Sequence, residues 1–159
     1  MAHTIRPALP GDAAALAALD ARVNFSPWSE AQFAAACCGH VRARDWALVV
    51  EEDARVDGFV VMARVLDEAT IYSIAIDPLQ QRKGLGQALL TAALDQAEQA
   101  GATRCLLEVR QSNSTARKFY KRNGFYLDGV RKGYYLTEGG REDALLLSKL
   151  LEGTADERA

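Results

Sequence analysis

The chain has 159 residues, of which 49% are hydrophobic and 25% charged, and its net charge is −2. This length suits one domain that buries roughly 70% of its unfolded surface, and the charge balance excludes a protein built to bind the phosphate backbone of nucleic acid. No apolar run approaches the roughly 20 residues of a membrane helix, and the N-terminal residues lack the apolar core of a secretory signal. We therefore expect a cytoplasmic protein.

The cysteines and histidines form no spacing typical of a metal or redox site. Cys37 and Cys38 are adjacent, and Cys105 stands alone in an apolar segment. Reduced, packed thiols are the simplest interpretation, because cysteine is among the most often buried residues. His3 and His40 are isolated in the sequence, so we predict no metal site and no histidine-based catalytic triad.

The first elements read as a short edge strand followed by two helices. The strand is predicted over His3–Ala8, and the turn Pro10–Asp12 precedes a helix. That helix should carry Leu16, Leu19 and Val23 on one buried face.

A second, shorter helix follows the turn at residues 24–28. Ser29 and Gln32 have the spacing of a capping box, and the helix is expected to end near Gly39.

The middle of the chain predicts three successive strands and then a long helix. The strands are predicted over Trp46–Val50, Gly58–Val65 and Ala69–Ile76. From Leu85 the apolar residues recur at helical spacing, and Gly101 is placed as a helix-terminating glycine.

The last part of the chain predicts a strand, a short helix and two final strands. The strands are expected over Thr103–Arg110, Phe125–Lys132 and Ala144–Leu150, and the helix between Asn113 and Gly124. Tyr134 and Tyr135 would then lie in the connection between the last two strands. This order predicts one α/β domain over residues 1–152, a mixed sheet with helices on its faces, and a disordered tail over residues 153–159.

The basic, glycine-bearing stretch at residues 77–87 is the main candidate for a binding site. It leads from a strand into the long helix, where unpaired amides and the helix dipole favour a phosphate group. The Walker pattern is absent, and the dinucleotide fingerprint fails because Leu89 stands where a small residue is needed. Glu108 lies about where that fold places its ribose-binding acid, so a dinucleotide site stays open as an alternative. The second alternative is that Gly84 and Gly86 simply lie at the start of a helix and bind no ligand.

The spacing Gln81-x-x-Gly84-x-Gly86 after a strand matches the acyl-CoA loop of the GNAT N-acetyltransferases. The resemblance extends over most of residues 27–150 and is strongest to the RimI subgroup. Its motifs are Pro27-Trp28-Ser29-Glu30, Val65-Leu66-Asp67-Glu68-Ala69-Thr70, Ile74-Ala75-Ile76-Asp77-Pro78, Leu107-Glu108-Val109-Arg110-x-Ser112-Asn113, Tyr120 with Gly124-Phe125, Gly133-Tyr134-Tyr135 and Gly140-Arg141-Glu142-Asp143-Ala144.

The resemblance implies a GNAT acyl-CoA N-acyltransferase fold, with about seven strands and helices on both faces. It also implies transfer of acetyl from acetyl-CoA to the N-terminal α-amine, an alanine, of the eighteenth small-subunit ribosomal protein. The partner would be the N-terminal peptide of that protein, with no direct contact to nucleic acid or membrane and no metal. A broader N-terminal or lysine acetyltransferase remains the alternative enzyme, and an inactive acyl-CoA-binding sensor the alternative that is not an enzyme.

The same resemblance implies which residues hold the cosubstrate. The strand residues would offer main-chain groups to the pantetheine arm, and the loop residues would hold the pyrophosphate through their amides. Asn113 would bond the cosubstrate near its thiol, although a helix N-cap is an equally natural role for it. The implied binding residues are Ile74, Ala75, Ile76, Arg82, Lys83, Gly84, Leu85, Gly86, Gln87 and Asn113.

Glu108 and Tyr120 are the implied catalytic residues. Glu108 would take the proton from the incoming amine; its alternative role is an ion pair with a nearby arginine. An α-amine is already roughly 10–20% neutral at pH 7, against about 0.04% for lysine, so a carboxylate base favours an N-terminal substrate. Tyr120 would return a proton to the CoA thiolate, and its alternative role is core packing. The cationic residues between Arg117 and Arg122 read as a solvated helix face or as a contact to the 3′-phosphate of CoA.

Overall fold

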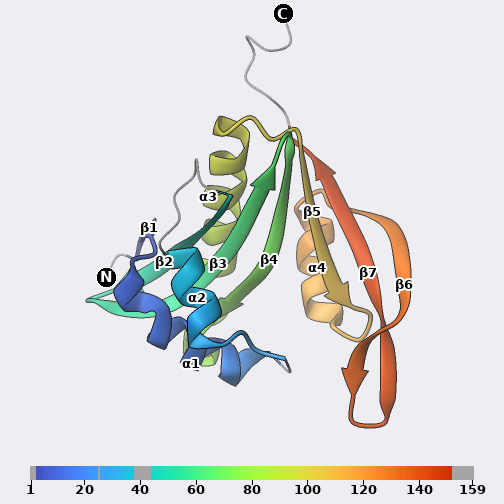
Figure 1. Ribbon diagram of the computed structural model, residues 1–159, viewed down its shortest axis with the longest axis horizontal. Helices are drawn as coiled ribbons and strands as arrows, with labels where there is room; N and C mark the ends of the chain where they lie inside the picture. Colours follow the sequence, from blue (N-terminus) through green and yellow to red (C-terminus); the bar gives the residue numbers. More distant parts are fainter. Residues whose placement is uncertain (1–2, 25, 38–43, 152–159) are drawn as a thin grey trace, which may run out of the picture.

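The computed structural model describes residues 3–24, 26–37 and 44–151 (Figure 1). Its α-helices are α1 (Ala13–Val23), α2 (Glu30–Cys37), α3 (Leu85–Gln99) and α4 (Ser114–Arg122), with short 3₁₀ turns at Pro10–Asp12 and Pro78–Gln80. Its strands are β1 (Thr4–Pro7), β2 (Asp45–Glu52), β3 (Arg55–Val65), β4 (Glu68–Ile76), β5 (Arg104–Arg110), β6 (Tyr126–Thr137) and β7 (Gly140–Leu150).

The strands form one seven-stranded mixed sheet in the order β1-β2-β3-β4-β5-β7-β6. Neighbours are antiparallel except β4 and β5, which run parallel and are joined through helix α3. The predicted mixed α/β sheet and the predicted position of the first strand at an edge are confirmed.

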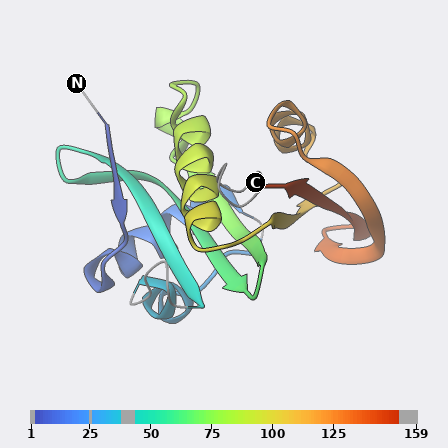
Figure 2. The same ribbon diagram turned by 90° about the horizontal axis from the view of Figure 1, so that it is seen from above.

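Helices cover both faces of the sheet (Figure 2). On one face α3 and α4 lie over a core that includes Trp46, Leu89 and Leu107. On the other face α1 and α2 pack over a second core that includes Leu16 and Phe33. The alternation of strand side chains explains the two cores, because successive residues point to opposite faces of the sheet.

The helix ends follow the local signals, with one exception. The capping box is confirmed: the Ser29 amide donates to Gln32 Oε1 (2.9 Å) and the Gln32 amide to Ser29 Oγ (3.2 Å). Gly101 has φ +97° just past α3, as a terminating glycine requires. Val23 does not join the buried face of α1; it is 37% exposed because it occupies the last turn, at the rim of a cleft.

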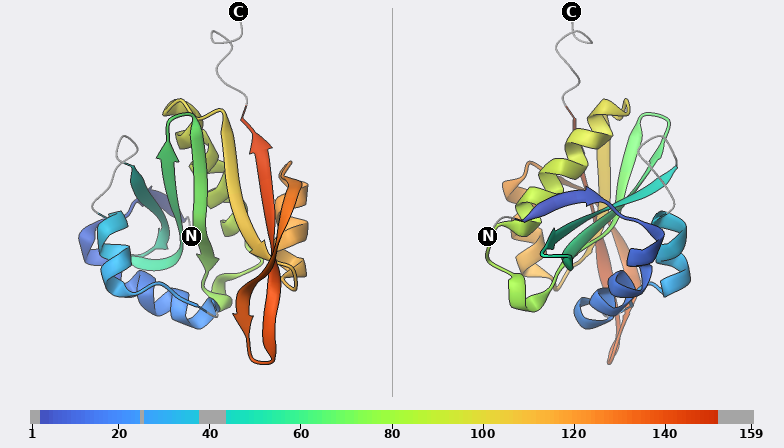
Figure 3. Two further views of the ribbon diagram at one scale, coloured as in Figure 1. Left: turned by 45° about the vertical axis from the view of Figure 1, so that its right-hand side comes forward. Right: turned by 90° about the vertical axis from the view of Figure 1, so that its left-hand side faces the viewer.

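The C-terminal hairpin differs from the prediction. Strands β6 and β7 are longer than expected and leave only residues 138–139 between them, so Tyr134 and Tyr135 lie on β6 rather than in a loop (Figure 3). A bulge hid this from the period-two pattern, because the pairing shifts between Arg131 and Tyr135. Gly133 takes φ +57° there, and its amide donates to Asp143 Oδ1 (2.9 Å).

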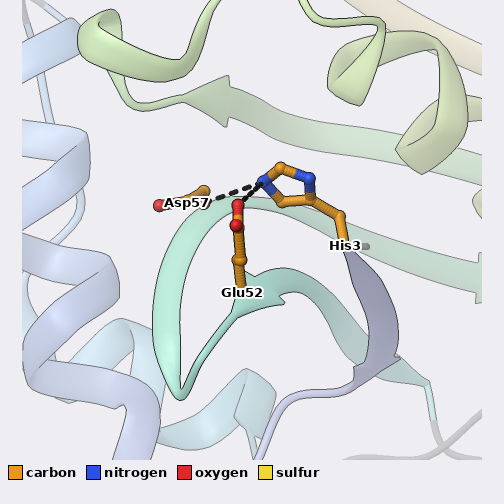
Figure 4. A group of neighbouring side chains, drawn as sticks. All are labelled: His3, Glu52 and Asp57. Atoms are coloured by element: carbon orange, nitrogen blue, oxygen red, sulfur yellow. Dashed lines mark hydrogen bonds and ion pairs between the residues drawn. The ribbon is translucent and has the colours of Figure 1, made fainter. Parts of the chain in front are cut away.

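Strand β1 is anchored by a cluster that places His3 among charged residues rather than alone (Figure 4). His3 Nε2 lies 3.0 Å from Glu52 Oε2 and 3.1 Å from the buried Asp57 Oδ2. Arg55 bonds both Asp57 oxygens, at 2.6 and 3.1 Å, and holds the pKa of Asp57 below its usual value. His3, Glu52 and Asp57 are residue types that can bind a metal ion. The positive charge of Arg55 already balances the buried carboxylate of Asp57, so we interpret the site as an ion-pair cluster.

The predicted burial of the thiols is confirmed for Cys37 and Cys105. Cys38, Gly39, His40 and the tail lie outside the described residues. Among the described helices, none combines the length and apolar character needed to cross a membrane.

Candidate active site

A cleft of about 920 Å³ opens where β4 and β5 separate. The two strands pair only from Glu68 with Arg104 to Ile71 with Leu107, and then diverge in a V (Figure 1). Tyr72 is an extra residue in β4 at this point, because Val61 pairs with Ser73 while Met62 pairs with Ile71. Such a bulge bends its strand, which explains the divergence.

The end of β4 presents its main chain to this cleft. Ile74, Ala75 and Ile76 pair with β3 on one side, and all three line the cleft on the other. β3 approaches closely here: a Cβ on Gly58 would lie 2.5 Å from the Ile76 side chain and 2.9 Å from the Ala75 carbonyl. The position of the predicted cosubstrate strand therefore depends on that glycine.

The basic loop ends in a helix start without a cap. Gln81 Nε2 donates to the Ile76 carbonyl (3.1 Å) and ties the loop to the end of β4. Gly84, the N-cap residue of α3, has φ +80° and no side-chain cap. The first cap-to-helix bond is from the Ala88 amide to the Gly84 carbonyl, and the amides of residues 82–87 have no partner among the described residues. A row of free amides at a positive helix end suits an anionic group.

Glycine is required for different physical reasons, and to different degrees, at positions 84 and 86 of the loop. At Gly84 the positive φ disfavours any side chain, although nothing lies within 4 Å of an added Cβ. At Gly86 an added Cβ would meet Ile76 and Phe119 at 3.8 and 3.9 Å, which is ordinary contact. The Gln87 side chain donates from Nε2 to Asn123 Oδ1 (2.7 Å), so the main-chain N–H of Gln87 is the group left for a ligand.

Glu108 lies on β5 and lines the cleft opposite the loop. Its side chain is 33% exposed, and Glu108 Oε1 lies 3.4 Å from Arg131 Nη1. The ion pair with an arginine, which the sequence offered as an alternative to catalysis, is therefore present in this structure. Tyr135 lies near: the pKa of its phenol is raised first by burial and second by the Glu108 charge.

Tyr120 lies on α4 between the rings of Phe119 and Phe125, at centroid distances of 5.3 and 5.6 Å. It is 6% exposed and lines the cleft, and its hydroxyl has no hydrogen-bond partner among the described residues. Burial raises the pKa of Tyr120 well above that of a free phenol. The packing role suggested by the sequence is thus present in the structure.

Asn113 serves as the N-cap of α4, accepting from the Ala116 amide with Oδ1 (3.1 Å). The sequence suggested that this side chain would serve either the helix or a ligand. Because capping uses only the oxygen, the amide nitrogen remains a donor for a second partner.

The basic run on α4 divides between two roles. Lys118 and Arg122 line the cleft together with Arg82, whereas Arg117 donates to the Gln111 carbonyl (2.9 Å). The cationic groups therefore gather at the same end of the cleft as the free amides.

Sequence reasoning assigned no role to Trp28, Tyr72 or Arg110, which also line the cleft. Trp28 packs on Tyr72 (6.0 Å between ring centroids) and both line the cleft, while Arg110 lies 4.3 Å over the Tyr135 ring. Arg131, which pairs with Glu108 but does not line the cleft, had no sequence signal, because it occurs within an ordinary polar strand pattern. The motifs around Trp28 and Tyr134–Tyr135 were the available signals, but only the fold brings them together.

A second hollow of about 970 Å³ lies over β5, β6 and β7. It is spanned by the ion pair of Arg104 with Asp128 (2.8 Å), and it holds none of the predicted site residues. The cleft between β4 and β5 is therefore the candidate active site.

The V-shaped opening between two parallel strands has a free amide row on one side and a carboxylate and a phenol on the other, which are groups that an acyl transfer from a phosphate-bearing carrier could use. The model of the acetyltransferase (GNAT) family matches residues 13–125. The chain belongs to this family and is an acetyltransferase. The dinucleotide-binding alternative is thereby wrong.

The similarity extends to individual relatives. The chain is 38% identical over 130 residues to a ribosomal protein bS18-alanine N-acetyltransferase of Escherichia coli strain K12, covering 82% of this chain and 85% of that one. The Haemophilus ducreyi protein of the same name is 33% identical over 134 residues, covering 84% and 90%. A crystal structure of the Escherichia coli ribosomal-protein-S18-alanine N-acetyltransferase aligns with a TM-score of 0.87 at 34% identity, covering 98% and 97%.

Proposed function

We propose that this protein transfers the acetyl group of acetyl-CoA to the N-terminal alanine of ribosomal protein bS18. The observation that carries the proposal is the divided cleft, with anion-binding amides on the α3 side and Glu108 and Tyr120 on the other. The relatives named for this reaction support it, since they are similar over more than four fifths of the chain. Such a substrate would place the protein in the cytoplasm.

The residues of the cleft fit acetyl-CoA. The free amides of residues 82–87 would hold the pyrophosphate, with charge added by Arg82 and Lys118. The exposed edge of Ile74–Ile76 would pair with the pantetheine amides as an added strand, and the Asn113 nitrogen would donate near the thiol end. Acetyl-CoA supplies the activated thioester.

The transfer needs one proton acceptor and one donor. The neutral amine forms the new C–N bond at the thioester carbonyl, and the N–H groups of residues 74–76 would stabilise the charge on its oxygen. Glu108 takes the proton that the nitrogen loses, directly or through a water. The C–S bond then breaks, and Tyr120 gives its hydroxyl proton to the thiolate.

The raised pKa of Tyr120 has two consequences for this role. Its phenol stays protonated at physiological pH, so the hydroxyl carries the proton that it would donate. Donation to a free thiolate of pKa about 8.5 becomes less favourable, but burial beside Tyr120 also raises the basicity of the thiolate. The two effects act in opposite directions.

Mass spectrometry of intact ribosomal proteins, from cells with and without this protein, tests the proposal. We expect one acetyl shift, on bS18 alone. Shifts on many N-termini, or on lysines, would support the broader acetyltransferase instead. Acetyl-CoA binding without any transfer would support the sensor.

A further inference from the structure

Charged or titratable groups of several elements surround Glu108, either lining the cleft or beside it. They are Arg131 and Tyr135 on β6, Glu142 on β7, Arg110 on β5, Tyr120 on α4, Tyr72 on β4 and Asp20 on α1. The strand neighbour Arg110 is held by Glu142 Oε1 (3.0 Å) and by the Leu136 carbonyl (3.1 Å). Arg131 forms an ion pair with Glu108, with Nη1 3.4 Å from Oε1.

Arg131 reaches Glu108 across an intervening strand. In the sheet, Glu108 is level with Leu146 of β7 and Arg131 with Ala144, so the two charged residues are diagonal neighbours separated by β7. Two strand spacings are about 10 Å, a distance that an arginine and a glutamate side chain together can span. The Arg131 guanidinium also lies 4.8 Å over the ring of Tyr134, which limits where it can point.

The bulge that begins after Arg131 fixes this arrangement. Asp143 accepts from the Gly133 amide (2.9 Å) and from Lys132 Nζ (3.3 Å), and Arg141 Nη1 donates to the Gly133 carbonyl (3.3 Å). Bulges commonly re-aim side chains beside active sites. Here the pinned bulge keeps Arg131 on the Glu108 side of the hairpin.

We propose that Arg131 is a positioning residue that orients Glu108 for proton transfer. By holding Oε1, it fixes the rotation of the carboxylate and leaves Oε2 to accept the proton of the amine, as an orienting third group does for other catalytic bases. The inference rests on the proposed function, in which Glu108 is the base. The pair is half-exposed, with side-chain exposures of 52% and 33%, so substrate can reach the carboxylate.

A double-mutant cycle tests this, with acetyl-CoA and a synthetic peptide that starts with alanine and has a free α-amine. We expect Arg131→Gln to lower kcat about tenfold without changing the KM for acetyl-CoA, and Arg131→Lys to restore most of the loss. In a Glu108→Gln background the Arg131→Gln change should cause no further loss, because the group it orients is gone. Arg44→Gln is the matched control, since it removes an arginine charge from an exposed residue outside the cleft, and should retain the wild-type kcat.

Two results would overturn the inference alone. One is an unchanged kcat in Arg131→Gln; the other is an equal tenfold loss in both backgrounds, which would show that Arg131 acts on something other than Glu108. A wild-type protein that does not acetylate the peptide would instead overturn the proposed function, and the inference with it.

Discussion

The two arms of the cleft are built on different physical principles. On the α3 arm the binding groups are main-chain amides, presented by a loop whose glycine, Gln81 and helix start are all within a few residues of one another. On the β5 side the candidate groups are side chains brought together from separate elements: Glu108 on β5 pairs with Arg131 on β6, and Tyr120 lies on α4. Binding is thus encoded locally, whereas the chemistry depends on the assembled sheet.

The sharpest way to separate the two arms is to remove the base. Glu108→Gln should lower kcat/KM for the acceptor peptide by about 10²–10³, because general-base assistance is lost, while acetyl-CoA affinity measured by calorimetry stays unchanged. Glu98→Gln, which removes a carboxylate outside the cleft, should behave as wild type. If both substrates bound more weakly in Glu108→Gln, the division between the arms would be wrong.

Removing the phenol should have a smaller effect in the same direction. We expect Tyr120→Phe to lower kcat about 10- to 100-fold with little change in acetyl-CoA binding, since the ring still fills its buried site and only the proton donor is lost. Tyr126→Phe, at a residue 73% exposed on β6, is the control. Unchanged turnover would exclude Tyr120 from the mechanism.

The binding arm can be perturbed through backbone geometry alone. Gly84→Ala places a side chain at φ +80°, at a strain of about 1–2 kcal/mol, and should weaken acetyl-CoA binding about tenfold by shifting the amides. Gly101→Ala, at φ +97° beyond the other end of α3, carries similar strain away from the cleft. Equal acetyl-CoA affinities for the two variants would show that the amide row does not bind the cosubstrate.

Asp57 provides a change to stability that should leave both arms intact. Arg55 holds the pKa of this buried carboxyl below its unfolded value, so its stabilisation is complete above about pH 4 and is lost as pH falls through the lower folded pKa. Asp57→Asn should therefore cost about 2 kcal/mol in urea unfolding at pH 7, and less below pH 4, with kcat unaltered in the folded protein. A difference from wild type that grew on acidification would contradict this linkage.

Much of the fold was predictable because its signals are local. The capping box at Ser29, the terminating glycine at Gly101 and the Asn113 cap each involve residues three or four positions apart, so a short segment contains all the required atoms. The same holds for the loop that ends at Gly84. The C-terminal hairpin was predicted less well, because the bulge at Gly133 breaks the alternation of side chains and ends the apparent strand five residues early.

From the sequence alone came the family resemblance and the amide-bearing loop, since these rest on residue types at short, characteristic spacings. The catalytic roles of Glu108 and Tyr120 are implied by that resemblance and stay predictions. The tertiary structure alone decided that β4 bends away at Tyr72, that His3 joins Glu52 and Asp57, and that Arg131 lies on Glu108. The physical reason is distance along the chain. A hydrogen bond between near neighbours is available to the unfolded segment, whereas an ion pair between β5 and β6 exists only after β7 has paired with both.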